Sequence, residues 1–153
     1  MAKVYVVTRP GLLFKVFYTI EQTVGKGCPN QTDDVALVQF FLRAVMEDDK
    51  AYKVPAGGPL SIDGICGPQT IQHIQSWQEQ ENKIADPMNR PPLDGQISPP
   101  SSGTFAGTRS HTRYAIITFN TIYAGIHGAD KHVNLFSDSR CPTKLVPGIF
   151  WSF

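Results

Sequence analysis

The stretch 60–78, LSIDGICGPQTIQHIQSWQ, constrains the fold of this chain more than any other. Asp63-Gly64 is a turn pair, because glycine accepts a positive φ and an aspartate side chain can bond nearby amides. Gly67 and Pro68 suit a helix start, with glycine at the N-cap and proline at the first helical position. Apolar residues then recur at helical spacing as far as Trp77. The stretch therefore predicts a tight loop that leads directly into an amphipathic helix.

A second helix is expected upstream of this loop. Thr32 or Asp33 can cap it, and the acidic pair 33–34 falls in its first turn, where the helix dipole favours negative charge. The acidic run 47–49 follows this helix and is expected to be solvated. An apolar stripe at helical spacing supports the helix: Leu37, Val38, Phe41, Leu42 and Val45.

A third helix is expected near the C-terminal side of the chain, beginning close to Thr108 or Ser110 and ending before Gly128. Before it, Asp94-Gly95 repeats the Asp63-Gly64 pair in outline, so a loop closed by Asp-Gly again precedes a helix. The apolar stripe of this third helix is Ala115, Ile116, Phe119, Ile122, Tyr123 and Ile126.

The two ends of the chain differ from this helical middle. Residues 3–7 and 12–20 are rich in Val, Tyr, Phe and Leu and flank Arg9-Pro10-Gly11, which predicts a β-hairpin. We expect Leu12, Phe14, Val16 and Tyr18 to face the core and the alternate set, Leu13, Lys15, Phe17 and Thr19, to face away. From Lys131 an irregular segment is expected. It ends in aromatic residues that either pack back on the domain or dock a partner protein: Phe150, Trp151 and Phe153.

Two motifs resemble the peptidoglycan-binding-domain-like family. The string Asp63-Gly64-x-x-Gly67-x-x-Thr70-x-x-x-Ile74-x-x-Trp77-Gln78 is similar to the family's second loop and helix, and Asp34-Val35-x-x-Val38-Gln39-x-x-Leu42 is similar to its first helix. The chain departs from the family pattern where Cys66 replaces an aromatic residue and His73 replaces a small one. The resemblance covers roughly residues 33–123. It implies a mainly α fold, a three-helix bundle that binds peptidoglycan.

Within that family, the chain resembles a subgroup linked to type VI secretion loci, through the opening from Val24-Gly25 to Val38-Gln39 and the helix end at Phe119-Asn120. We expect residues 1–31 to form the hairpin and its loop, residues 32–128 the peptidoglycan-binding-like helical domain, and residues 129–153 an aromatic tail packed on it.

Composition narrows the range of functions. The chain has 153 residues, a formal net charge of +1, 41% hydrophobic residues and 18% charged residues. These values indicate a folded domain. The near-zero net charge and the absence of a run of Lys or Arg give no reason to expect nucleic-acid binding. No apolar run approaches the roughly 20 residues that span a bilayer, and the N-terminal residues do not have the pattern of a signal peptide. We expect a protein made in the cytoplasm that acts at the cell envelope only if a route other than Sec delivers it.

Catalytic and metal-binding patterns are weak. Cys28, Cys66 and Cys141 are widely spaced and are expected to be reduced, with one disulfide and a spare thiol as the alternative. His127 and His132, with Asp130 between them, lack a third ligand, so neither a metal nor another cofactor is expected. The carboxylates available to a glycoside hydrolase are few. They are Glu79, Glu81, Asp86 and Asp94.

The leading hypothesis is a non-catalytic peptidoglycan-binding module that serves an envelope-attacking or secretion system. Neutral hydrogen-bonding side chains near aromatic rings suit glycans and stem peptides, and the candidate ligand-binding residues are Gln69, Thr70, Gln72, Gln75, Trp77, Tyr114 and Asn120. For a second set we expect a structural role in the loops and helix starts: Gln39, Asp63, Gly64, Gly67, Pro68 and Gln78. The alternatives are an adaptor that docks a partner protein through the hairpin and tail, and a cell-wall hydrolase or secreted effector.

Overall fold

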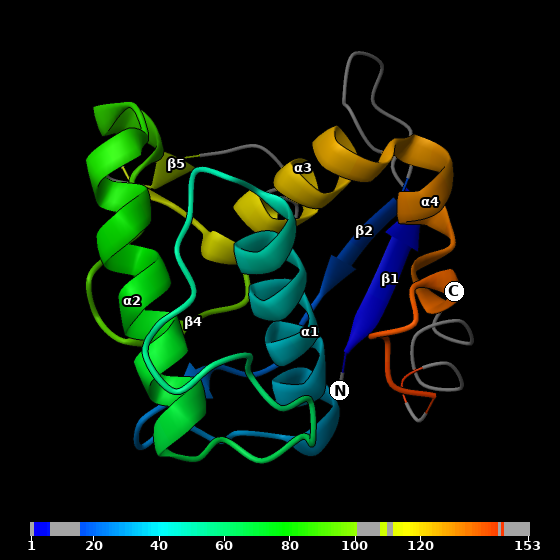
Figure 1. The fold of residues 1–153 in the computed structure, drawn as a ribbon, viewed down its shortest axis with the longest axis horizontal. Coiled ribbons are helices and arrows are strands. Elements are labelled where there is room, and N and C mark those ends of the chain that lie inside the picture. The colour runs from blue at the N-terminus through cyan, green and yellow to red at the C-terminus, as the bar shows by residue number, and fades with distance from the viewer. Residues whose placement is uncertain (1, 7–15, 101–107, 110–111, 144, 146–153) are drawn as a thin grey trace.

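The computed structural model of the chain describes residues 2–6, 16–100, 108–109, 112–143 and 145. The fold is mainly helical, with a small antiparallel hairpin near the N-terminus (Figure 1). The α-helices are α1 (Thr32–Asp48), α2 (Pro68–Ile84), α3 (Ala115–His127) and α4 (Ala129–Val133), and the short 3-10 helices are Pro87–Asn89 and Leu135–Ser137.

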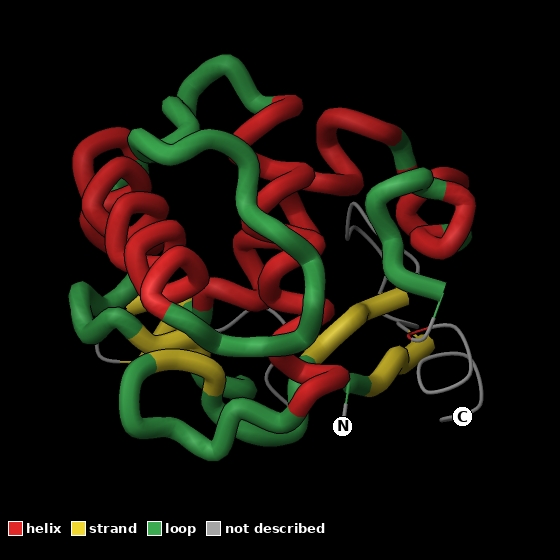
Figure 2. The backbone as a smooth tube through the Cα atoms, turned by 60° about the horizontal axis from the view of Figure 1, so that its bottom comes forward, coloured by secondary structure: helices red, strands yellow, loops and turns green. Residues whose placement is uncertain are grey.

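The strands form short antiparallel pairs at the periphery of the helices (Figure 2). In the hairpin, Lys3 lies opposite Thr19, and Val6 lies opposite Val16. This confirms the expected strand pairing, although the expected turn and residues 12–15 lie outside the described part of the chain. The strands are β1 (Lys3–Val6), β2 (Val16–Thr19), β3 (Val24–Gly25), β4 (Gln96–Ile97), β5 (Thr108–Arg109) and β6 (Thr112–Arg113), paired β1–β2, β3–β4 and β5–β6.

Helix α1 lies at the centre of the molecule, between α2 and the β1–β2 hairpin in Figure 1. It contacts both α2 and α3, as well as β3. The expected apolar stripe is buried, but so are Ala36, Phe40 and Ala44 on other faces of the helix. Because neighbours cover α1 on several sides, its apolar surface extends well beyond a single stripe.

An aromatic cluster joins the three longer helices. The ring of Trp77 in α2 lies 4.5 Å from that of Phe119 in α3, and Phe119 stacks 5.9 Å from Phe41 in α1. Phe40 and Tyr123 extend the cluster, with their ring centres 5.7 Å apart. All of these rings are buried, so the packing of the helices depends on them.

Helix α2 begins where the sequence indicates. Gly67 is its N-cap residue and Pro68 its first helical residue. Helix α3 ends at Gly128, whose φ of 87° is readily accessible to glycine. The expected start of α3 near Thr108 or Ser110 is wrong, because α3 begins only at Ala115. The β-branched residues Thr108 and Thr112 lie instead in the paired strands β5 and β6, a conformation that β-branching favours.

The N-terminus of α1 also differs from expectation. Gln31 is the N-cap residue, and Thr32 is already helical. No side-chain hydrogen bond caps this end. Asp34 has a different role: its carboxylate accepts hydrogen bonds from the amides of Glu21 and Gln22, at 3.2 and 3.1 Å. The acidic first turn therefore ties the chain after β2 to α1.

Two further expectations need correction. Phe17 and Thr19 are buried together with Tyr18, so strand β2 has no solvent-exposed face here and the expected alternation is wrong for these residues. The segment from Lys131 is not wholly irregular, because α4 and the 3-10 turn at Leu135–Ser137 follow α3 directly.

The expected tail residues Phe150, Trp151 and Phe153 lie outside the described residues. Among the described helices, none has the length and apolar content needed to cross a bilayer.

Candidate functional site

Gln39 organises the loop before α2. Its side-chain oxygen accepts hydrogen bonds from the backbone amides of Asp63 and Gly64, at 3.0 and 2.8 Å. Its amide nitrogen lies within 3.0 Å of the Ile65 carbonyl, the Asp63 carboxylate and the Thr70 hydroxyl. The Asp63 carboxylate in turn accepts the amide of Ile65 at 2.9 Å, and Gly64 adopts a φ of 77°. The side chain of Gln39 is buried, so these bonds satisfy its polar atoms and hold the turn.

Gln78 repeats the arrangement one helix later. Its oxygen accepts the amide of Gly95 at 2.9 Å, and its nitrogen donates to the Gln96 carbonyl and the Asp94 carboxylate. Asp94 accepts the amide of Gln96 at 2.9 Å, as Asp63 does in the first loop. The φ of Gly95 is 69°. Two Asp-Gly turns are thus held by a buried glutamine from the preceding helix.

Asn120 holds the hairpin to α3 in a comparable way. Its oxygen accepts the amide of Tyr18 at 3.0 Å, and its nitrogen donates to the carbonyls of Tyr18 and Ile116, both at 2.8 Å. The same oxygen lies 2.9 Å from Nε2 of His132. Since this oxygen only accepts, Nε2 of His132 carries the proton. Burial lowers the pKa of His132 to about 4, which leaves the imidazole neutral at pH 7.

An open groove of about 310 Å³ lies between α2 and the second Asp-Gly turn. Leu93 is two-thirds exposed at its edge, and the side chain of Gln75 lies over Gly95, where an added Cβ would meet it at 3.4 Å. The lining residues are Gln75, Gln78, Glu79, Leu93, Asp94 and Gly95. The groove thus presents an amide, two carboxylates and an aliphatic side chain.

The predicted ligand-binding residues fall into different environments. Thr70, Trp77 and Asn120 are buried, so their side chains do not reach the surface of this structure. Gln69 is directed at the backbone, with its nitrogen 3.3 Å from the Pro59 carbonyl. Tyr114 is half-buried as the N-cap residue of α3 and does not line the groove.

Of the predicted residues, Gln72 and Gln75 are exposed on α2, and Gln75 lines the groove. Sequence reasoning missed Leu93 as a site residue. The sequence feature that could have identified it is an apolar residue immediately before the second Asp-Gly pair. Glu79 and Asp94, candidates for glycoside hydrolysis, do share the groove, but both are exposed. An acid that protonates a glycosidic oxygen needs a buried setting, which neither residue has.

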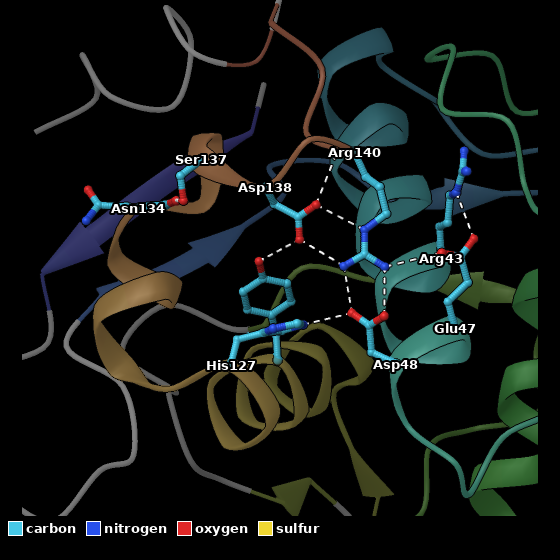
Figure 3. A network of polar contacts seen from close by, with 9 residues as sticks. Arg43, Glu47, Asp48, His127, Asn134, Ser137, Asp138 and Arg140 are labelled. Atoms are coloured by element: carbon cyan, nitrogen blue, oxygen red, sulfur yellow. Dashed lines mark hydrogen bonds and ion pairs between the residues drawn. The ribbon is translucent and has the colours of Figure 1, made fainter.

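A charged network joins the C-terminal end of α1 to α3 and the segment after α4 (Figure 3). The Arg140 guanidinium contacts the Asp48 carboxylate at 3.0 and 2.6 Å and the Asp138 carboxylate at 3.0 and 2.9 Å. His127 Nε2 lies 2.8 Å from Asp48, and the Tyr123 hydroxyl donates to Asp138 at 2.8 Å. Asp48 is therefore a paired residue, which corrects the expectation of a solvated acidic run.

The electrostatics of this network favour a structural role. Burial raises the pKa of Asp48 and of Asp138, but the hydrogen bonds and charge of Arg140 lower it, together with a hydrogen bond from His127 to Asp48 and one from Tyr123 to Asp138. These effects combined hold both pKa values below the usual range for aspartate. A carboxylate with a lowered pKa is a poor general base. The network stabilises the contact between elements and offers little for proton transfer.

The three cysteines, together with His127 and His132, also lack the features of catalytic groups. All three cysteines are free thiols, and burial raises the pKa of each, to about 11 for Cys141. A nucleophilic cysteine requires the opposite shift. His127 bonds Asp48 and His132 bonds Asn120. In the described part of the chain no group of three or more His, Cys, Asp or Glu residues could hold a metal ion.

No family model, no curated protein and no solved structure matches this chain.

Proposed function

We propose that this chain is a non-catalytic peptidoglycan-binding module that acts as an accessory or targeting component of an envelope-attacking or secretion system. The observation that carries the proposal is the groove beside the second Asp-Gly turn. There the exposed amide of Gln75 stands beside the exposed aliphatic side chain of Leu93. Amide groups suit the N-acetyl groups and peptide bonds of peptidoglycan, and an aliphatic surface suits the apolar faces of sugars.

We further propose that α1, α2 and α3 form the three-helix bundle implied by the sequence resemblance. The support is the repeated link between a buried glutamine and an Asp-Gly turn, from Gln39 to the first turn and from Gln78 to the second. The motif residues shared with the family pattern are used here to shape loops. A ligand would then contact the exposed side chains of α2 that lie at this groove and the outer surface of the second Asp-Gly turn.

Co-sedimentation with purified insoluble peptidoglycan tests this function. We expect the protein to sediment, and we expect a variant with both Gln75→Ala and Leu93→Ser to bind about fivefold more weakly, since a loss of about 1 kcal/mol corresponds to that ratio. The matched control carries Gln22→Ala and Ile126→Ser, an exposed amide and an exposed aliphatic residue elsewhere on the molecule.

Absence of co-sedimentation over a range of salt concentration and pH would contradict the proposal. Equal binding by the groove variant and the parent protein would move the site away from this groove. Release of soluble muropeptides from the same material, with and without added zinc, tests the hydrolase alternative. Reproducible release would show that the module is catalytic.

A further inference from the structure

A second groove, of about 480 Å³, lies along a different edge of α2 from the groove beside the second Asp-Gly turn. One wall is the loop 51–55 between α1 and α2, and the other is the C-terminal half of α2. Its volume is within the range of roughly 300–1,000 Å³ that is usual for small-ligand sites. The lining residues are Ala51, Lys53, Val54, Pro55, Ser76, Gln80, Lys83 and Ile84.

The loop wall of this groove is fixed by Gln80. The side-chain oxygen of Gln80 accepts the backbone amide of Lys53 at 2.8 Å, and its nitrogen donates to the Lys53 carbonyl at 2.9 Å. The same nitrogen donates to the Ser76 hydroxyl at 3.1 Å. The amide of Gln80 is therefore fully engaged, and the loop is held at a set distance from α2. A preorganised wall lowers the ordering cost of binding.

The groove carries positive charge without a balancing acid. No acidic residue is among its lining residues, and within the described chain neither Lys53 nor Lys83 forms an ion pair. Ser76 accepts from Gln80, which leaves its own hydrogen available to donate. The polar groups open to a ligand are thus two ammonium groups and one hydroxyl donor.

Apolar residues line the same groove. Val54 and Ile84 are 37% and 54% exposed, and Pro55 is also a lining residue. A strongly hydrated phosphate or a polyanion would gain nothing from this aliphatic floor. A ligand that combines a carboxylate with an aliphatic side chain would satisfy both parts of the groove.

We propose that this groove binds a short peptide, with a free carboxylate between Lys53 and Lys83 and an aliphatic side chain against Val54 and Ile84. Lysine suits this role because its ammonium is a mobile point charge that can follow a carboxylate. This site is separate from the groove beside the second Asp-Gly turn, and the proposal for it does not rest on the proposed function.

The test is an NMR titration of the intact protein with the acetylated peptide Ala-Leu-Glu-Ala, which has two carboxylates and one leucine. We expect saturable shifts at the backbone amides of Lys53, Val54, Lys83 and Ile84, with a Kd on the order of 1 mM. A peptide with Gln in place of Glu and an amidated C-terminus should bind at least about fivefold more weakly, as should one with Ser in place of Leu.

The protein variant Lys53→Gln with Lys83→Gln should weaken binding of the charged peptide about fivefold, whereas Lys131→Gln, an exposed lysine on α4, should leave it unchanged. Raising the salt concentration should weaken binding to the parent protein, an arm that requires no substitution. The proposal is overturned if no saturable shift appears by about 10 mM peptide, a concentration at which a 1 mM site is mostly filled. It is equally overturned if the uncharged peptide or the double variant binds as well as the charged peptide binds the parent protein.

Discussion

At the residue scale, buried amide side chains hold the loops of this protein. A glutamine amide supplies both a donor and an acceptor, so one side chain can close a turn on its amide and carbonyl groups together. Gln39 and Gln78 do this from α1 and α2, and Asn120 does it from α3. Each follows a residue packed in the core: Val38, Trp77 and Phe119. The burial of that neighbour positions the amide at the edge of the core, where the backbone of the next segment passes.

We predict that Gln39→Ala lowers the free energy of unfolding by about 2–4 kcal/mol, because the amides of Asp63 and Gly64 lose their acceptor in a buried setting. Gln39→Glu should be at least as destabilising. It preserves the size of the side chain but turns a donor toward the Ile65 carbonyl into an acceptor. Urea denaturation measures both, with the exposed Gln72→Ala as a control that should change stability by less than about 0.5 kcal/mol.

The comparison of the two substitutions separates hydrogen bonding from packing. If volume alone mattered, Gln39→Glu would be nearly neutral while Gln39→Ala remained costly. That outcome would contradict the role assigned to the amide.

At the element scale, the sequence predicts what local chemistry determines. The start of α2 follows from Gly67 and Pro68, and the end of α3 follows from Gly128. Helix α4 was not predicted, because a segment of five residues is too short to show a helical period. The burial of Phe40 and of both faces of β2 depends on contacts with segments distant in the sequence, which no local pattern encodes.

The candidate site was predictable only in part, for the same reason. Gln75 is identifiable as an exposed polar residue on a helix. The groove that it lines exists because the second Asp-Gly turn returns to α2, and that return depends on Gln78 and on the pairing of β3 with β4. The burial of Trp77 likewise depends on Phe119, more than 40 residues later in the chain.

The hairpin should depend on α3 through one side chain. We predict that Asn120→Ala exposes the Tyr18 amide to faster hydrogen exchange, because that amide donates to the Asn120 oxygen. The effect should be concentrated in β1 and β2 and be much smaller at the amides of α2. Thr121→Ala, a half-buried neighbour on the same helix, is the control and should leave exchange in the hairpin unchanged. Equal acceleration in α2 and the hairpin would show instead that the substitution acts by global destabilisation.

At the scale of the whole molecule, the C-terminal side of the structure closes over the hairpin and α1. Tyr18 donates its hydroxyl to the Val133 carbonyl at 2.7 Å, and its ring meets the His132 ring edge-on at 5.3 Å. Arg140 ties the following segment to Asp48 on α1. Helix α4, the segment that follows it and the β1–β2 hairpin are thus stabilised together, and His132 is enclosed where they meet.

This enclosure makes the stability of the molecule sensitive to pH. Burial lowers the pKa of His132 from 6.5 to about 4, so the unfolded chain binds a proton at a higher pH than the folded one. The stabilisation is fully present above pH 6.5 and is lost as the pH falls toward 4. Between pH 6.5 and 5, this group alone should lower the free energy of unfolding by about 1.5 kcal/mol. Burial also lowers the pKa of His73, which adds a loss in the same direction.

Chemical denaturation at pH 6.5 and pH 5 measures this difference. His132→Gln should reduce the loss, because glutamine can still donate to the Asn120 oxygen and does not titrate, and the further change His73→Gln should reduce it again. NMR titration of the His132 ring in the unaltered protein provides an independent reading that does not depend on how the variants fold. A ring that titrates near 6.5 would contradict the prediction, since an imidazole enclosed by Tyr18, Asn120 and Tyr123 can accept a proton only at the cost of a buried charge.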